Sequence, residues 1–599
     1  MQNVSQEWKD NQKKTLVGES DIEISLKMTD PDAYEDATAE DNGDVFFSDT
    51  NHIVSDGEKH IRPYATLETN QWLLDGSREI VPDSDYGEVG YVGEMLCTSD
   101  KVFAANPIVT INFTQVHTNL LQGITIKWSE FLNEYAVEFI VTAYNGETVV
   151  ATKTVTNNTS VLSAVMFDIS DYDKIVVEVM KWSMAHRRAR IDEIFVGINK
   201  IFSKKDIFSY KCSHSVDPIS AELPKSEVSF SIDNLDSTYN PYNAEGLSKY
   251  LMERQEINVR YGYKLSDKIE WISGGKYYIS EWDAKQSGMN ADFKARDLLE
   301  FMTGTYYRGL YNANGTSLYD LAEDVLLDAN LPLNSDGSTK WVIDERLKDI
   351  YTTAPLPIDT HANCLQMIAN ATESVFYQDR DGTLHLEQRT DAFDNSRDTF
   401  EYGITYFNSY SKSDLSLSKP LKQVDVPCYS YSIAEQSSEL FNGTVSISGT
   451  KDVVLTYSGT ATNVLANVSG GTVNSATYYS NACVLNITAN GDVTIIITGK
   501  ALESSSMLIS TISSISGETV TVDNPLITSQ DRAISIGLWV ERYMKNRMTL
   551  SSEWRADPRL DALDLVDNEN DYGVNKVIMT NVEYSYNGAF RGSGEGRVI

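Results

Sequence analysis

The chain has 599 residues, of which 50 are Lys or Arg and 86 are Asp or Glu, so its formal net charge at pH 7 is −36. A chain of this length exceeds one hydrophobic core, and roughly three to five domains are expected. Binding nucleic acid requires clustered positive charge that releases counterions, so the acidic composition argues against a protein that grips phosphates.

The opening residues, MQNVSQEWKDNQKKT, contain no apolar segment, and no run of about 18 apolar residues occurs along the chain. We therefore expect neither a signal peptide nor a membrane anchor of a standard kind. The five cysteines lie far apart without a C-x-x-C pair, which favours reduced, buried thiols over a disulfide framework.

Residues 1–90 begin with an alternating strand through Ile22, Ile24 and Leu26. An acidic loop at 30–44 has carboxylates that suit a hard cation, but their spacing does not match an EF-hand, so a solvated loop is favoured. This segment does not close a core alone, and we expect residues 198–305 to complete the same domain.

Residues 91–197 have the pattern of a β-sandwich, because short runs of strand-forming residues alternate with turn residues such as Gly123 and Asn145-Gly146. We expect strands at 108–113, 124–128, 135–144, 148–155, 161–168, 174–182 and 190–196. The segments ITIKWSEFLNEYAVEFIVTAYNGETVV and YDKIVVEVMKWSMAHRRARIDEIFVG resemble the galactose-binding, discoidin-type jelly roll of many carbohydrate-binding modules. That group commonly has an Arg-Ile-x-Glu-Ile pattern in its last strand, which Arg190, Ile191, Glu193 and Ile194 match. The sandwich is thus an insertion in the first domain.

A sugar site needs an exposed aromatic face for stacking and planar polar groups that hydrogen-bond hydroxyls. The candidates of these types are Trp128, Tyr135, Trp182, Arg187 and Arg188. In the alternative interpretation, which we favour, Trp182 belongs to the core and the arginines pair with surrounding acids.

The stretch at 215–243, SVDPISAELPKSEVSFSIDNLDSTYNPYN, contains a strand in which Val228, Phe230 and Ile232 alternate with polar residues. Further along we expect a helix at 247–255 and a strand at 256–263. A hairpin around Gly274-Gly275, a strand at 291–295 and a helix at 297–302 complete this region. The strand at 256–263 is expected to be an edge that is covered or pairs between protomers.

Residues 306–417 change to an α+β pattern. Apolar residues at helical spacing predict helices at 317–329, where Ser317 and Asp320 resemble a capping box, and at 359–371. A hairpin of 374–378 and 383–387 follows. Asp379 and Asp381 in its turn suggest a metal loop, but hairpin chemistry accounts for both.

The remaining residues indicate a second discontinuous β domain, 418–436 plus 525–599, with a helix at 534–546 and strands near 563–566, 577–580 and 582–586. Between its parts, residues 437–524 are rich in Ser and Thr. We expect this block to be an inserted β domain, a small sandwich with strands at 453–457, 484–487, 493–497 and 519–522.

Catalytic patterns are absent from the sequence: it has no zinc-protease, serine-hydrolase, P-loop or dinucleotide-binding motif. The seven histidines are scattered without the spacing of a zinc site. Adjacent acids such as Asp192 and Glu193 carry little information in so acidic a chain. We therefore predict no catalytic residue, no metal site, no cofactor and no enzymatic activity.

The order of several segments carries a second resemblance. YATLETNQWLLDGS, WSMAHRRARIDEIFVG, the stretch at 215–243, EWISGGKYYISEWDA, LQMIANATESVFYQDRDGTLHLEQR and NGAFRGSGEGRV resemble tail proteins of phages and prophages of Gram-positive bacteria. Such proteins resemble the hub of contractile baseplates and the N-terminal part of siphophage tail-associated proteins. The implied fold is multidomain and mainly β, with two hub-type β-barrels (1–90 plus 198–305, and 418–436 plus 525–599) and the α+β segment 306–417.

The resemblance also implies partners. Three copies form a six-barrel ring that connects the tail tube to the tip, so the expected partners are the chain itself as a homotrimer, tail tube or distal tail proteins, and tip, spike or fibre proteins. DNA passes only as transient cargo, and the sandwich is a candidate for binding host cell-wall polysaccharide. The protein would be assembled in the bacterial cytoplasm and reside in the virion tail, with lytic activity left to another protein. The alternative is a carbohydrate-binding surface adhesin or carbohydrate-active enzyme in which the sandwich binds the ligand.

Overall fold

The structure is a computed structural model, and it describes most of the chain. The described residues are 1–14, 18–28, 33, 36–43, 45–48, 53–54, 64–75, 78, 90–118, 120–243, 251, 254–266, 268–284, 288–334, 338–389, 399–403, 412–555 and 557–599. The expected helix at 247–255 lies largely outside them, whereas most of the expected acidic loop at 30–44 is described, and its residues 38–41 form a strand rather than a solvated loop.

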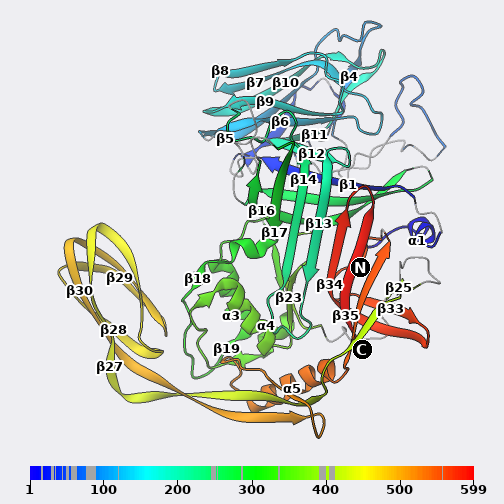
Figure 1. The fold of residues 1–599 in the computed structure, drawn as a ribbon. Coiled ribbons are helices and arrows are strands. Elements are labelled where there is room, and N and C mark those ends of the chain that lie inside the picture. Colours follow the sequence, from blue (N-terminus) through cyan, green and yellow to red (C-terminus); the bar gives the residue numbers. More distant parts are fainter. Residues whose placement is uncertain are drawn as a thin grey trace. The chain divides into compact units, whose positions relative to one another are not determined.

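The chain forms two compact units, both built mainly of strands (Figure 1). The larger unit contains Met1–Glu23, Ser203–Asp233 and Val259–Ile599. The smaller unit contains Ile24–Phe202 and Asn234–Asn258. The chain passes between the units four times: within β1 (Ser20–Met28), within β12 (Ile198–Ser203), directly after Asp233, and within β15 (Glu256–Lys264).

The smaller unit contains a β-sandwich of two five-stranded sheets, ordered β2-β5-β10-β7-β8 and β3-β4-β11-β6-β9. All seven strands expected between 108 and 196 are present. Six of them place buried side chains in a shared apolar core, whereas the strand at 148–155 packs only the half-buried Ala151 and Val155 against it. Residues 38–48, which we had assigned to the first barrel, supply β2 and β3. The strands are β2 (Thr38–Asp41), β3 (Val45–Ser48), β4 (Tyr91–Leu96), β5 (Ile108–His117), β6 (Leu121–Trp128), β7 (Ala136–Asn145), β8 (Thr148–Val155), β9 (Leu162–Ile169), β10 (Tyr172–Trp182) and β11 (Arg188–Phe195), followed by β12 (Ile198–Ser203).

The main sheet of the larger unit has the strand order β15-β16-β17-β14-β13-β34-β35-β32-β26, with β33 beside β34 and β25 beside β33. The strands assigned to the two predicted barrels are therefore neighbours: β13 pairs with β34 from Tyr210↔Tyr586 to Ser215↔Asn581. The strands are β13 (Ile207–Ser215), β14 (Lys225–Asp233), β16 (Ile269–Asp283), β17 (Asn290–Arg296), β25 (Thr399–Tyr402), β26 (Asp414–Leu417), β32 (Met548–Arg555), β33 (Leu565–Asn570), β34 (Gly573–Tyr586) and β35 (Phe590–Val598).

The expected strand in the 215–243 stretch is confirmed as β14, which lies between β13 and β17. Val228, Phe230 and Ile232 are buried, and the Phe230 ring stacks on Phe293 at a centroid distance of 5.0 Å. The apolar side chains of the alternating pattern thus point into the interior of the larger unit.

Two expectations for the next strands are wrong. No hairpin forms at Gly274-Gly275, since β16 runs through both glycines. A Cβ at Gly274 would lie 2.9 Å from Cζ of Tyr261, so the glycine makes room for a ring on the neighbouring strand. The strand at 256–263 is not an edge either, because β15 lies between β1 and β16.

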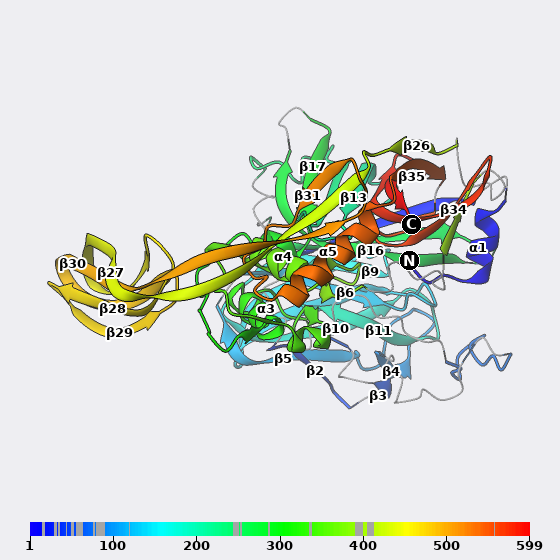
Figure 2. The same ribbon diagram turned by 90° about the horizontal axis from the view of Figure 1, so that it is seen from below.

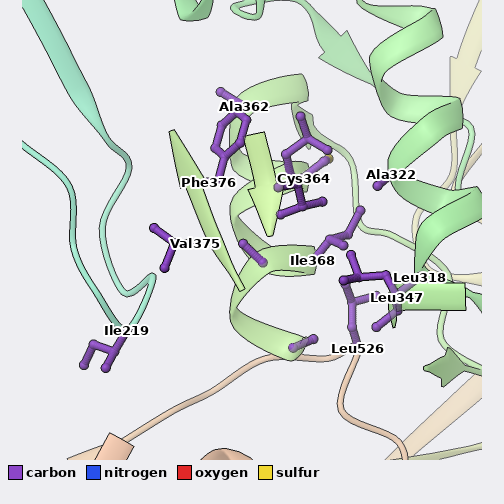
Figure 3. Packing of buried hydrophobic residues seen from close by; sticks show 14 of the residues in the cluster. Ile219, Leu318, Ala322, Leu347, Ala362, Cys364, Ile368, Val375, Phe376 and Leu526 are labelled. Carbon is purple, nitrogen blue, oxygen red and sulfur yellow. The ribbon is translucent and has the colours of Figure 1, made fainter. Parts of the chain in front are cut away.

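The α+β segment has the predicted helices and hairpin: α3 (Leu318–Asp328), α4 (His361–Ala371), β23 (Val375–Gln378) and β24 (Leu384–Glu387). Ser317 and Thr360 cap the helices by accepting from the backbone N–H groups of Tyr319 and Asn363. Figure 3 shows the apolar core between these elements. The remaining short elements of the larger unit are α1 (Gln6–Gln12), η4 (Leu298–Phe301), β18 (Thr305–Tyr306), β19 (Thr316–Ser317), β20 (Trp341–Ile343), η5 (Glu345–Asp349), β21 (Tyr351–Thr352) and β22 (Asp359–Thr360).

The Ser/Thr-rich block forms a long β arm, which we define as residues 421–521. Its two long strands extend side by side from α5 (Gln530–Met544) in Figure 2. All strands of the arm belong to one sheet, ordered β28-β30-β27-β31 with β29 beside β30, rather than to a small sandwich. The border predicted at residue 437 falls inside the first long strand. The strands are β27 (Leu421–Thr456), β28 (Ala461–Ser469), β29 (Thr472–Tyr478), β30 (Ala482–Ile512) and β31 (Glu518–Thr521).

Candidate functional sites

The two tryptophans proposed to stack on sugars lie in the core of the sandwich. Trp128 and Trp182 are both 0% exposed, and their rings meet edge to face at 6.0 Å. The indole N–H of Trp128 donates to Ser163 Oγ at 2.8 Å, and that of Trp182 donates to Glu134 Oε2 at 2.9 Å. Neither ring has a face for a sugar, because both faces are covered by protein.

The other three candidates also contact the protein. Arg187 pairs with Glu134 at 2.9 Å and donates to the Thr69 carbonyl at 2.5 Å. The guanidinium of Arg188 lies 4.2 Å from the ring centroid of Phe46 and donates to the Gly93 carbonyl at 3.2 Å. Tyr135 is half-buried and packs against the sandwich core. The structure thus places the candidates in and against the core, as the alternative interpretation expects.

A buried ion pair beside these arginines was not predicted. Arg190 binds both carboxylate oxygens of Glu68, one of them at 3.0 Å, and the backbone N–H of Arg188 donates to Glu68 at 2.8 Å. Burial alone would raise the pKa of Glu68, but the hydrogen bond and charge of Arg190 hold that pKa below its ordinary value. The partners are more than 100 residues apart, so no local pattern indicates the pair.

The segment that Glu68 anchors presents apolar side chains to solvent. Thr66 and Gln71 close a turn through a backbone hydrogen bond of 3.3 Å, and Arg187 holds Thr69 in the same turn. Trp72, directly after the turn, is 50% exposed. This ring, unlike those of Trp128 and Trp182, is among the exposed aromatic side chains of the smaller unit.

The larger unit encloses a polar cluster between its strands. Cys212 Sγ lies 2.9 Å from His214 Nε2, which also lies 2.9 Å from the hydroxyl of Tyr277. Burial alone would raise the pKa of Cys212, but the charge and hydrogen bond of His214 lower it to about 7. Cys212 has no exposed surface, so this pair of a nucleophile and a base does not meet a substrate in this conformation.

A second buried cluster joins the β23–β24 hairpin to the main sheet. Arg380, in the hairpin turn, pairs with Asp561 at 2.5 Å and donates to the carbonyls of Ser273 at 2.8 Å and Leu560 at 3.1 Å. Its guanidinium lies 5.7 Å from the ring centroid of Tyr261. The turn that we considered as a metal loop thus places the Arg380 side chain in the buried interior beside the main sheet.

The tip of the β arm contacts the α+β segment. The backbone N–H of Ser480 donates to the Gly309 carbonyl at 2.9 Å, and the Asn481 side chain donates to the Leu356 carbonyl at 2.9 Å. The arm has its own apolar core, which includes Leu455, Cys483 and Ile495.

Within the described part of the chain, no group of three or more His, Cys, Asp or Glu side chains is arranged to hold a metal ion. Over the same residues, no helix has the length and apolar character needed to span a membrane. All five cysteines are free and buried.

Comparison with known proteins gives likeness to solved structures only. No protein-family model matches the chain, and no curated protein matches it. The solved structures that it resembles include a 43 kDa tail protein of prophage MuSo2 from Shewanella oneidensis, with 9% identity and a TM-score of 0.36, covering 66% of this chain and 95% of that one. A tail protein from Neisseria meningitidis MC58 has 11% identity and a TM-score of 0.36, with coverages of 66% and 93%. Prophage tail protein gp18 from Listeria monocytogenes EGD-e has 8% identity and a TM-score of 0.35, with coverages of 67% and 91%. Values of this size identify no function for the chain.

Proposed function

We propose that this chain is a structural protein of a phage or phage-like tail, the hub at the end of the tail tube. In this proposal three copies form a ring that connects the tube to tip, spike or fibre proteins and lets DNA pass. The protein has no catalytic role, and the sandwich is a candidate for contact with host-wall glycans.

The pairing of β13 with β34 is the observation that carries the proposal. It joins the two parts of the chain that the sequence resemblance assigns to the two hub barrels, although about 360 residues separate them in sequence. A single sheet built from both parts suits a structural role. The sandwich and the β arm are long segments inserted between the strands of this sheet.

The chemistry of the buried clusters agrees with a scaffold rather than an enzyme. Cys212, His214 and Arg380 are all satisfied by protein partners inside the larger unit. A buried charge pair is costly to separate, so such groups fix how strands and hairpins fit together. The acidic composition also suits a channel that repels the DNA backbone and lets it pass without adhesion.

Cryo-electron microscopy of tail particles that contain the chain tests this proposal. We expect three copies at one end of the tail tube. The purified chain should accordingly form trimers in multi-angle light scattering. A stable monomer at micromolar concentration together with absence from the tube end would refute it.

The exposed ring of Trp72 favours a second candidate function, binding of a carbohydrate by the smaller unit. A held turn next to an exposed indole offers the rigid stacking face that sugars require. A glycan array probed with the full chain and with Trp72→Ala tests it, using Tyr242→Ala, another exposed aromatic of the same unit, as the control. Binding that survives Trp72→Ala would assign the sugar to another surface.

A further inference from the structure

The strand β26 forms one end of the main sheet. It pairs with β32 on one side, and no described strand pairs with its other side. Leu415 is 48% exposed and Leu417 is 66% exposed, so the apolar side chains of this strand are not covered by described residues. Figure 2 shows β26 at the margin of the larger unit. An open edge of this kind can accept another strand.

The backbone of β26 faces outward at two positions. The N–H of Ser418 donates to the Arg547 carbonyl at 2.8 Å, which sets the phase of the ladder with β32. Residues in an antiparallel ladder alternate between bonding their partner strand and facing away from it. The N–H and C=O groups of Leu415 and Leu417 therefore point away from β32, where an added strand would bond them.

A cavity of about 240 Å³ lies beside this edge and is lined by β26, β32, β34, β35 and α5. Ser416, Thr549, Ser551 and Thr580 give it hydroxyl groups, and Asp414 and Glu595 give it two carboxylates; Arg597 and Tyr543 also line it. Among the described residues, neither carboxylate has an ion-pair partner.

Arg597, the one guanidinium in the lining, makes no ion pair with these acids among the described residues. Arg597 donates to the carbonyls of Met544 at 3.4 Å and Asn546 at 3.2 Å, and it lies 4.8 Å from the ring centroid of Tyr543. Its charge is thus held at the C-terminal end of α5, where carbonyl groups favour a cation. The rest of the cavity favours a positively charged side chain.

We infer that β26 is a strand-addition site that binds an extended segment of another polypeptide and takes a Lys or Arg side chain of that segment into the adjacent cavity. Backbone hydrogen bonds to Leu415 and Leu417 give such a complex its affinity, and the cavity gives it specificity. The inference does not depend on the hub proposal, because it concerns one edge of a single chain.

Binding of synthetic peptides to the full chain tests the inference. The first peptide is acetylated, has about seven residues, the length of a typical strand, and alternates Thr and Val around a central Lys. The second has Glu in place of that Lys. We expect the Lys peptide to bind and to slow amide hydrogen exchange at residues 415 and 417, and the Glu peptide to bind at least about tenfold more weakly. Equal binding of both peptides, or protection at other strands only, would overturn the inference.

Two sets of substitutions locate the site. Leu415→Pro removes an outward N–H without removing a bond to β32, so it should abolish binding. The double substitution Asp414→Asn and Glu595→Gln leaves the backbone intact and should remove the preference for Lys over Glu. Glu281→Gln, on an exposed carboxylate of β16, is the matched control and should leave both peptides unaffected. A preference for Lys that persists in the double variant would contradict the role of the cavity.

Discussion

At the scale of single residues, Asp297 caps a helical turn with a carboxyl group that is buried, and its negative charge is unfavourable there. Its carboxyl group is buried and caps the helical turn η4 by accepting from the Leu299 N–H at 3.0 Å. Burial raises the pKa of Asp297 to about 7. The capping bond needs only an acceptor oxygen, so the negative charge adds a desolvation cost without adding a bond.

This conflict predicts a pH-dependent effect of Asp297→Asn. The folded state holds the Asp297 proton more tightly than the unfolded state, so the stabilising contribution of this group is complete below about pH 4 and is lost as the pH rises to about 7. The amide keeps the capping oxygen and does not ionise. We expect the variant to match the wild type at pH 4 and to have a higher thermal unfolding midpoint at pH 8.

Asp344→Asn is the matched control, since Asp344 caps the similar turn η5 by accepting from Arg346. Burial alone would raise the pKa of Asp344, but the hydrogen bonds and charge of Arg346 lower it, which is the opposite direction. Its stabilising contribution is present above about pH 4 and is lost as the pH falls, so this variant should be less stable than the wild type at pH 8. An effect of Asp297→Asn that is the same at pH 4 and pH 8 would show that charge burial is not its cause.

The residue type alone did not show which aromatic side chains of the sandwich unit are exposed to solvent. Trp128 and Trp182 are the right kind of side chain for a sugar site, yet their strand positions point into the core. Trp72 lies outside any predicted strand, and it follows a turn whose Glu68 and Thr69 are held by residues 187–188, more than 100 residues further along the chain. A pattern of neighbouring residues does not contain that information.

At the scale of secondary-structure elements, alternation of apolar and polar residues was a sufficient signal wherever one face of a strand is buried. It located β14, whereas the seven sandwich strands that follow residue 107 were located by runs of strand-forming residues between turn residues. Glycines were less informative. Gly274 and Gly275 suggested a turn, whereas the missing side chain at Gly274 serves the packing of Tyr261.

Glycines in β35 have a similar packing role, which gives a second prediction. Gly592 is the cross-strand partner of Trp554, and a Cβ added to Gly592 would lie 2.3 Å from the indole. Trp554 is buried and donates to the Asp557 carbonyl at 3.2 Å, so its ring has little freedom to move. We expect Gly592→Ala to lower the free energy of unfolding of the larger unit by about 1–3 kcal/mol, the cost of overpacking a core.

Chemical denaturation followed by tryptophan fluorescence measures this loss. Gly459→Ala is the control, because no atom lies within 4 Å of the Cβ that it would add. Equal stability of the two variants would mean that the Trp554 ring can shift freely.

At the scale of the whole chain, the strand pairings between distant segments could not be predicted from the sequence. The resemblance of segment order suggested that the regions around 207–296 and 548–598 belong to related domains, but it did not indicate the pairing of β13 with β34. Such contacts depend on the closure of long loops, and local patterns do not encode the partner. The same limit applies to the β arm, whose strands continue through the border predicted at residue 437.

The β arm gives the third prediction, removal of its outer part. Ile433 and Leu502 are cross-strand partners in β27 and β30, so a two-residue Asn-Gly turn can replace residues 434–501 while the remaining ladder keeps its register. The excised segment contains the whole apolar core of the arm, whereas Val424, Val426 and Ile536 belong to the core that the arm base shares with α5 and the α+β segment. Only a few contacts with the rest of the chain are lost, mainly those of Ser480 and Asn481.

We therefore expect the shortened chain to fold, with the thermal midpoint of the remaining structure lowered by only a few degrees for a loss of about 1 kcal/mol. Removing one residue more, 434–502, is the informative control. It would place Ile433 opposite Glu503, and a slip of one residue turns every later side chain of β30 to the opposite face, away from α5. This second variant should aggregate or lose the α5 contact in hydrogen exchange. If both variants unfolded alike, the arm would be part of the main core rather than an excursion from it, and the assignment of an inserted domain would be wrong.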